Sequence, residues 1–136
     1  AMMSPQDDLT LIKLTVALEA GGESYDGKKA VAWVIINRMK AWRQQAVRVT
    51  LAPYQFSCWL REFNFVSNLE RMPEKVLEES YAAAKSAYEG LSIDLTNGAT
   101  HYLNVELTKK LRGGTLPGWV YKLEKTAVIG QHTFFK

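Results

Sequence analysis

The stretch from Thr15 to Arg38 constrains the fold of this chain more than any other. It contains two apolar segments separated by a pair of adjacent glycines, which predicts two helices with a break between them. The second segment is apolar nearly all round from Ala30 to Ile36, which predicts the central core helix. The stretch reads TVALEAGGESYDGKKAVAWVIINR.

Glu19, near the end of the first predicted helix, is the candidate catalytic residue. Ile12, Thr15 and Val16 precede it by seven, four and three positions, so its side chain would extend an apolar stripe of the helix. Apolar surroundings disfavour the charged form and raise the pKa of a carboxyl group, as a general acid near neutral pH requires. The alternative is a helix-end glutamate that points to water, because Glu is rarely buried without a partner.

Glu23 is a possible secondary carboxylate. Gly21 and Gly22 lie between it and Glu19, so helical spacing does not place the two carboxylates on one face. As a second catalytic group, Glu23 would indicate hydrolysis. We prefer a structural role at the opening of the second helix, where a negative charge stabilises the helix dipole.

Composition favours one domain over residues 1–136, with Ala1 as an expression scar. The chain has 136 residues, 47% of them hydrophobic, which is enough for a sizeable core. Its single cysteine, Cys58, excludes an internal disulfide and a cysteine-based zinc site, and we expect a buried apolar thiol. The net charge of +3 comes from scattered Lys and Arg residues, which does not indicate nucleic-acid binding but would suit weak attraction to an anionic polymer such as a cell wall.

The order of predicted elements is mainly α with a small β element. Helices are expected at about residues 5–20, 26–40 and 73–89, a short strand within 99–104, and a final strand within 126–135 that Gly130 interrupts. Residues 41–72 are aromatic-rich without a clear period, which indicates a short hairpin under a groove or the groove wall itself. No apolar run is long enough to span a membrane.

Four blocks of sequence resemble the SleB/CwlJ-type cell wall hydrolases, a family of spore cortex-lytic enzymes and some phage endolysins. They occur in the family order and together extend from residue 12 to 136, nearly the whole chain. The blocks are EAGGESYDGK with AVAWVIINR at 19–38, PYQFSCW at 53–59, GATHYLN at 98–104, and IGQHTFF at 129–135.

This resemblance implies a fold related to goose-type lysozymes and lytic transglycosylases. It also implies an enzyme that cuts peptidoglycan between N-acetylmuramic acid and N-acetylglucosamine without a cofactor, with Glu19 as the catalytic residue. A lytic transglycosylase would leave a 1,6-anhydro end, and we expect this outcome. The alternatives are a hydrolytic muramidase that uses a second carboxylate, a peptidoglycan-binding module without catalysis, and, as a weaker rival, an amide or peptide cleavage.

The other blocks supply candidate substrate-binding residues. Polar side chains could hold N-acetyl or hydroxyl groups, and aromatic rings could stack on a sugar, although large aromatics are more often core residues. The two histidines lack carboxylates at ligand spacing, so we expect them to line or support the groove without a metal. The candidates are Gln55, Phe56, Ser57, Trp59, Thr100, His101, Tyr102, Asn104 and His132.

The sequence also carries an expectation about setting. The first residues lack the basic and apolar regions of a signal peptide, so we expect a monomeric protein made in the cytoplasm that acts on the cell wall after release, as a phage endolysin does. The excised domain of a secreted or spore enzyme is the alternative.

Overall fold

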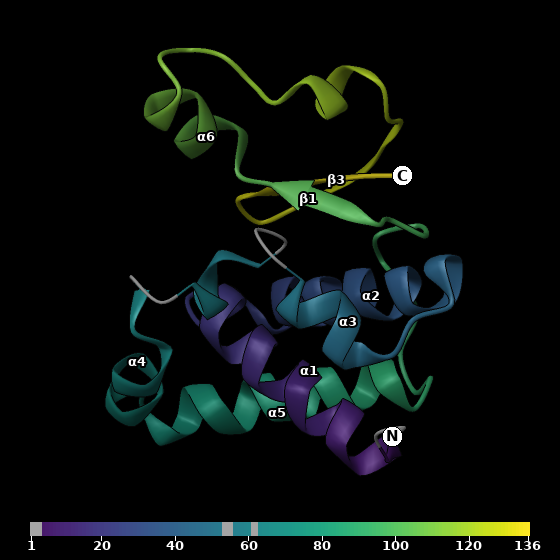
Figure 1. The fold of residues 1–136 in the computed structure, drawn as a ribbon, viewed down its shortest axis with the longest axis vertical. Coiled ribbons are helices and arrows are strands. Elements are labelled where there is room, and N and C mark those ends of the chain that lie inside the picture. Colours follow the sequence, from purple (N-terminus) through teal and green to yellow (C-terminus); the bar gives the residue numbers. More distant parts are fainter. Residues whose placement is uncertain (1–3, 53–55, 61–62) are drawn as a thin grey trace.

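The chain folds into a helical layer and a smaller layer that carries the sheet (Figure 1). The computed structural model describes residues 4–52, 56–60 and 63–136. The helical layer contains α1 (Pro5–Ala20), α2 (Tyr25–Trp42), α3 (Ala46–Leu51), η1 (Ser57–Trp59), α4 (Phe65–Arg71) and α5 (Glu74–Tyr88). The second layer contains β1 (His101–Leu103), α6 (Val105–Leu111), η3 (Gly118–Tyr121), β2 (Lys125–Ile129) and β3 (His132–Phe135). The mainly α prediction with a small β element is confirmed.

Helix α1 begins and ends where the sequence predicts. The Ser4 hydroxyl accepts a hydrogen bond from the Asp7 backbone N–H, and the Asp7 carboxylate accepts one from the Ser4 backbone N–H. This reciprocal cap, with Pro5 at the first helical position, fixes the start of the helix. Ile12 and Val16 are fully buried on its inner face.

The glycine pair ends α1, although not through a left-handed turn. Gly21 keeps right-handed helical angles, with φ at −57° and ψ at −31°. A Cβ on Gly21 would lie 2.7 Å from the Ala17 carbonyl oxygen, whereas a Cβ on Gly22 would meet no atom within 4 Å. Close packing therefore explains the need for glycine at position 21.

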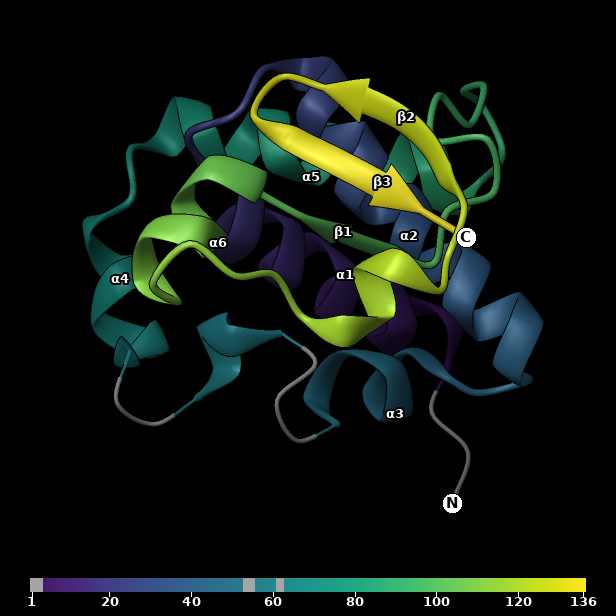
Figure 2. The same cartoon turned by 90° about the horizontal axis from the view of Figure 1, so that it is seen from above.

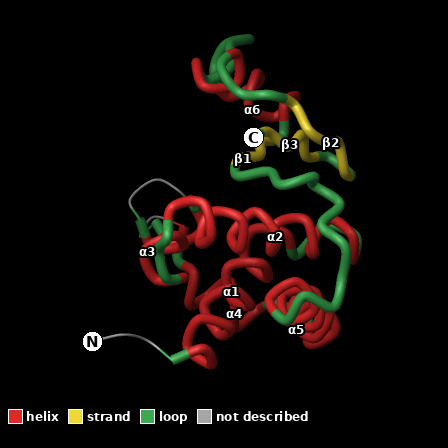
Figure 3. Tube along the Cα trace, turned by 90° about the vertical axis from the view of Figure 1, so that its right-hand side faces the viewer, coloured by secondary structure: helices red, strands yellow, loops and turns green. Residues whose placement is uncertain are grey.

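Helix α2 is the central helix, as predicted, and it lies between the sheet and the pair α1 and α5 (Figure 3). Its N-cap is Ser24, whose hydroxyl accepts a hydrogen bond from the Gly27 backbone N–H. One face joins the main core with α1 and α5. The other face packs Ala30 and Val34 against Phe134 of β3.

The prediction of a hairpin in residues 41–72 is wrong for the described part of this segment. It forms α3, η1 and α4, and no strand occurs among its described residues. Six or seven helical residues span less than two turns, too few for aromatic-rich sequence to show a helical period. The alternative for this segment, a groove wall, agrees with Ser57, Cys58 and Met72, which line a hollow beside Glu19.

The sheet has the strand order β1-β3-β2, with both pairs antiparallel. His101 pairs with Phe135 in the β1 and β3 register. Gly130, at φ 58°, turns the chain between β2 and β3, so the interruption predicted there is the bend of a hairpin. Figure 2 shows this hairpin and α6 lying over the helical layer.

Helix α6 was not predicted, because its seven residues follow a strand and are mostly polar. Asn104 caps it by accepting a hydrogen bond from the Leu107 backbone N–H at 3.0 Å. The cap also fixes the Asn104 side chain next to the β2 and β3 turn, where its Nδ2 donates to the Gln131 side chain at 3.3 Å.

Two residues at the end of α2 join the layers. Asn37 Nδ2 donates to the Asp94 carboxylate at 2.9 Å and to the Ala99 carbonyl at 3.0 Å, and Arg38 Nε donates to the Thr100 carbonyl. These contacts anchor the segment that leads into the sheet to the end of α2. Among the described residues, no helix is both long and apolar enough to cross a membrane.

Candidate active site

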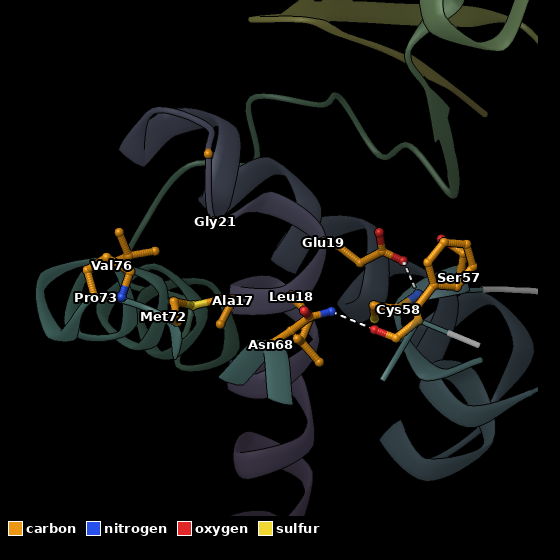
Figure 4. Close-up of a pocket in the computed structure, with 12 residues that line it drawn as sticks. Ala17, Leu18, Glu19, Gly21, Ser57, Cys58, Asn68, Met72, Pro73 and Val76 are labelled. Carbon is orange, nitrogen blue, oxygen red and sulfur yellow. Dashed lines mark hydrogen bonds between the residues drawn. The ribbon is translucent and has the colours of Figure 1, made fainter. Parts of the chain in front are cut away.

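Glu19 lies in the last turn of α1 and borders hollows that residues of both layers line (Figure 4). Its side chain is partly buried, and its Oε1 accepts a hydrogen bond from the Cys58 backbone N–H at 3.4 Å. Burial raises the pKa of the carboxyl group above its usual range, and hydrogen bonds from Cys58 and the charge of Arg38 partly oppose that rise. The environment thus has the acid-like character that the sequence predicted.

Two hollows flank Glu19. The larger, of about 460 Å³, lies on the side of η1, α4 and the start of α5, and its lining includes Leu18, Cys58, Met72 and Val76 (Figure 4). The smaller, of about 350 Å³, lies toward β3 and α6. Glu19 borders both hollows. An extended ligand that occupied both of them would therefore pass its carboxyl group.

The smaller hollow brings Glu23 and His132 together. Glu23 Oε1 and His132 Nδ1 lie 3.1 Å apart, and each side chain is about 15% exposed. Neither atom has a well-aligned hydrogen bond within the described part of the chain. Burial lowers the pKa of His132, and the Glu23 charge offsets part of this shift.

Glu23 does not act as the cap of α2, because Ser24 occupies that position. Glu23 instead contacts the hairpin of β2 and β3, because a Cβ on Gly130 in the turn would lie 3.3 Å from Glu23 Oε1. Asp26, the other carboxylate near the start of α2, is exposed and pairs with Lys29 at 3.3 Å.

Arg38 is a buried cation beside the site, with a relative exposure of 4%. Its guanidinium lies 4.9 Å from the Phe56 ring centroid and 5.3 Å from that of Trp42. The positive charge interacts with Glu19 and Tyr102, and it contributes to the lowered pKa of His101. Arg38 therefore acts on the electrostatics of the site from beneath it.

Three of the predicted aromatic residues pack inward. Phe56 is 3% exposed, and Trp59 Nε1 donates to the Thr15 hydroxyl at 3.0 Å. Tyr102 contacts the Phe56 and His132 rings at centroid distances of 6.5 and 5.0 Å. These rings lie beneath the site and support it. Phe56 and Trp59 therefore pack as core residues, which was the alternative to stacking on a sugar.

Some of the remaining predicted residues line the hollows, and the others lie in the sheet layer away from them. Ser57 is exposed and lines the larger hollow, whereas Asn104 and His132 line the smaller one. Thr100 and His101 line neither of these two hollows. They contact each other at 2.9 Å, and His101 packs 5.0 Å from the Trp119 ring. Gln55 lies outside the described residues.

Sequence reasoning missed several residues of the site. Cys58 was expected to be a buried apolar thiol, yet it is half-buried and contacts the Glu19 carboxyl group. Gly22, Leu107 and Gln131 also line the smaller hollow. The position of Cys58 inside a motif block was a usable signal, whereas Leu107 and Gln131 depend on α6 and the hairpin turn, whose places in the fold the sequence did not give.

Within the described ranges, no group of three or more His, Cys, Asp or Glu side chains gathers in a way that could hold a metal ion. The titratable groups around Glu19 are instead single residues from separate elements.

The sequence model of the cell wall hydrolase family matches residues 22–135. The chain belongs to this family. It is therefore a cell wall lytic enzyme, as the sequence resemblance implied. Because the matched range begins three residues after Glu19, the catalytic assignment of Glu19 rests on its surroundings and on the sequence motif.

Two solved structures share the fold of this cell wall hydrolase. The catalytic domain of the Bacillus cereus SleB protein matches with a TM-score of 0.72 and 27% identity, covering 96% of this chain and 91% of that one. The catalytic domain of the germination-specific lytic transglycosylase SleB from Bacillus anthracis matches with a TM-score of 0.71 and 26% identity, covering 96% and 95%. Comparison with curated protein sequences found no match. The predicted SleB-type family and lysozyme-like fold are confirmed.

Proposed function

We propose that this enzyme cleaves the glycan strand of peptidoglycan between N-acetylmuramic acid and N-acetylglucosamine, as a lytic transglycosylase with Glu19 as acid and base. The observation that carries the proposal is the position of Glu19, a carboxyl group with a raised pKa between two hollows. The description of the Bacillus anthracis relative as a lytic transglycosylase supports it.

The reaction needs one carboxyl group in two protonation states. Protonated Glu19 donates its proton to the glycosidic oxygen as the bond from that oxygen to C1 of muramic acid breaks. The muramic acid 6-hydroxyl then attacks C1, and the Glu19 carboxylate accepts the hydroxyl proton. Glu19 returns to its starting state and no water is consumed, which leaves a 1,6-anhydro end.

Hydrolysis is a second candidate, favoured by the presence of Glu23 in the same hollow as Glu19. A hydrolytic enzyme would need Glu23 to activate water or to stabilise the developing positive charge. The contact of Glu23 with His132 supports the structural role, because it places the Glu23 carboxylate against β3.

Mass spectrometry of digested peptidoglycan tests the proposal. We expect muropeptides with 1,6-anhydromuramic ends, which are lighter by one water than the products of a hydrolase. Reducing ends throughout the digest would contradict the transglycosylase reaction and would favour Glu23 as a second catalytic group. Release of free peptides from intact glycan would contradict glycan cleavage itself.

We propose that the peptidoglycan strand is the only substrate and that the enzyme does not bind nucleic acid. We also propose that the enzyme is a monomer. The biological setting, release from the cytoplasm as a phage endolysin or action as part of a secreted or spore enzyme, stays a prediction. Detection of the protein in a lysing culture, before and after lysis, would distinguish the two.

A further inference from the structure

We propose that Cys58 is a positioning residue for Glu19, holding the carboxyl group through its backbone N–H and its thiol in the orientation that proton transfer requires. The inference rests on the proposed catalytic role of Glu19. It assigns a role to the single cysteine of the chain, which was expected only to be a buried apolar thiol.

The first observation is that Cys58 meets the carboxyl group with two donors. Its backbone N–H donates to Glu19 Oε1 at 3.4 Å (Figure 4), and a hydrogen bond from its thiol is among the interactions that lower the pKa of Glu19. Both donors come from η1, a segment 39 positions away in sequence. Two donors from one residue restrict the rotation of a carboxyl group that ends a flexible side chain.

The second observation is that the thiol remains protonated. Burial, the Glu19 charge and the hydrogen bond to Glu19 all raise the pKa of Cys58 far above that of a free thiol. A thiol in this state is a poor nucleophile but keeps its S–H available for donation. Cys58 is therefore suited to holding the acid and unsuited to attacking the substrate.

The third observation is that Cys58 sits at the wall of the larger hollow, where substrate would lie. Trp59, the next residue, is anchored to α1 by its hydrogen bond to Thr15. Since Thr15 and Glu19 lie one turn apart on α1, this anchor fixes η1 in register with the carboxyl group. The Cys58 donors are thus positioned by the same helix that carries the acid.

Other charged or titratable groups also face Glu19 and must be considered in any test. Arg38 of α2 and Tyr102 of β1 interact with its charge, and Glu23 and His132 share the smaller hollow with it. Arg38 acts in the same direction as Cys58, because its positive charge also favours the ionised carboxylate. Cys58 exerts the larger influence of the two on the Glu19 pKa.

The first experiment compares the pH profiles of wall lysis for the wild type and Cys58→Ala. The donor of the backbone remains, but loss of the thiol disfavours the ionised carboxylate, so the basic limb of activity should move upward by about 0.5 to 1 pH unit. Ser80→Ala is the control, because it removes a buried hydroxyl that donates to the Val76 carbonyl within α5 and is not among the groups that shift the Glu19 pKa. Its basic limb should stay in place, since a purely structural loss changes activity without moving the limb.

The second experiment measures the reverse effect and needs no activity. Because Cys58 is the single cysteine, its reaction with a maleimide reports on one thiol. In Glu19→Gln the negative charge is gone, so the thiol pKa should fall and labelling should become about tenfold faster at a fixed pH. In the control Glu23→Gln, which removes a carboxylate that does not contact Cys58, the labelling rate should stay at the wild-type value.

Coincident basic limbs for the wild type and Cys58→Ala, or equal labelling rates for the wild type and Glu19→Gln, would overturn the proposal. Failure of the proposed function appears differently, as a folded Glu19→Gln protein that still lyses walls. The two failures are therefore distinguishable.

Discussion

The proposed chemistry of this enzyme depends on single residues around Glu19. Burial raises the pKa of this carboxyl group, while Cys58 and Arg38 limit the rise. The opposition is useful, because the proposed reaction needs Glu19 to donate a proton in one step and to accept one in the next. A carboxyl group buried without donors would hold its proton too tightly to donate it in the first step.

A change of Glu19 to Gln should stabilise the protein at alkaline pH and leave it nearly unchanged at pH 4. The pKa of Glu19 is raised in the folded state, so its stability contribution is present below the unfolded value of 4.5 and is lost as pH rises through the folded pKa. Above that range the wild type contains a poorly solvated carboxylate, which Gln removes. Thermal unfolding at pH 8 should show a melting temperature roughly 2 to 5 °C higher for the variant.

An equal effect of Glu19→Gln at pH 4 and pH 8 would contradict the raised pKa. Asp26→Asn is a suitable control, because this carboxylate is exposed and lies outside both hollows.

Glu23 should prove structural when it is replaced by Gln. The change removes the charge next to His132 Nδ1. It therefore weakens the contact between β3 and the segment that connects α1 to α2. We expect lower thermal stability and lysis that follows the folded fraction, with 1,6-anhydro products unchanged. Full stability combined with loss of lysis would instead make Glu23 a catalytic carboxylate, and this outcome is measured by thermal unfolding together with product analysis.

At the level of elements, the site depends on how α1 ends and on where η1, β3 and α6 meet it. The sequence predicted α1, α2, α5 and the short strands, because their caps and periods are local features such as Ser4 with Asp7. It did not predict α6 or the helices between residues 41 and 72. A helix of six or seven residues is too short for its apolar positions to show a helical period. Glu19 was proposed from its apolar helical face. Its contact with Cys58, and the presence of His132 in the same hollow, depend on the tertiary fold.

The two glycines after Glu19 should respond differently to alanine. In Gly21→Ala the new Cβ would lie 2.7 Å from the Ala17 carbonyl oxygen, a backbone atom that cannot move away easily. We expect a loss of roughly 1 to 3 kcal/mol in the free energy of unfolding, measured in urea.

Gly22→Ala is the matched variant, since its Cβ would meet no atom within 4 Å. Its free energy of unfolding should stay within about 0.5 kcal/mol of the wild type. Equal losses for both variants would show that flexibility, and not close packing, is what the glycine pair provides.

At the level of the whole molecule, two layers meet at the site, and α2 connects them. Its last turns hold the segment that leads into the sheet, through Asn37 and Arg38. The helical layer supplies Glu19 and Cys58, and the sheet layer supplies His132 and Asn104. Proper assembly of the layers is therefore a condition for the site.

Asn37→Ala should weaken this assembly. The change leaves the Asp94 carboxylate and the Ala99 carbonyl without their donor, which should cost roughly 1 to 3 kcal/mol in the free energy of unfolding. Thr10→Ala is a control, because its exposed hydroxyl bonds only within α1 among the described contacts. A change in Asn37→Ala no larger than in Thr10→Ala, measured by urea unfolding, would contradict the connecting role.

Lysis of purified cell walls by the folded Glu19→Gln protein is the most direct test of the central claim, that Glu19 is the acid and base of glycan cleavage. The change keeps the shape of the side chain but removes the transferable proton. We predict a fall in the lysis rate of at least the roughly 10²- to 10⁴-fold that a positioned acid or base group supplies, in a protein whose circular dichroism matches the wild type. Near wild-type lysis by that folded variant would contradict the account.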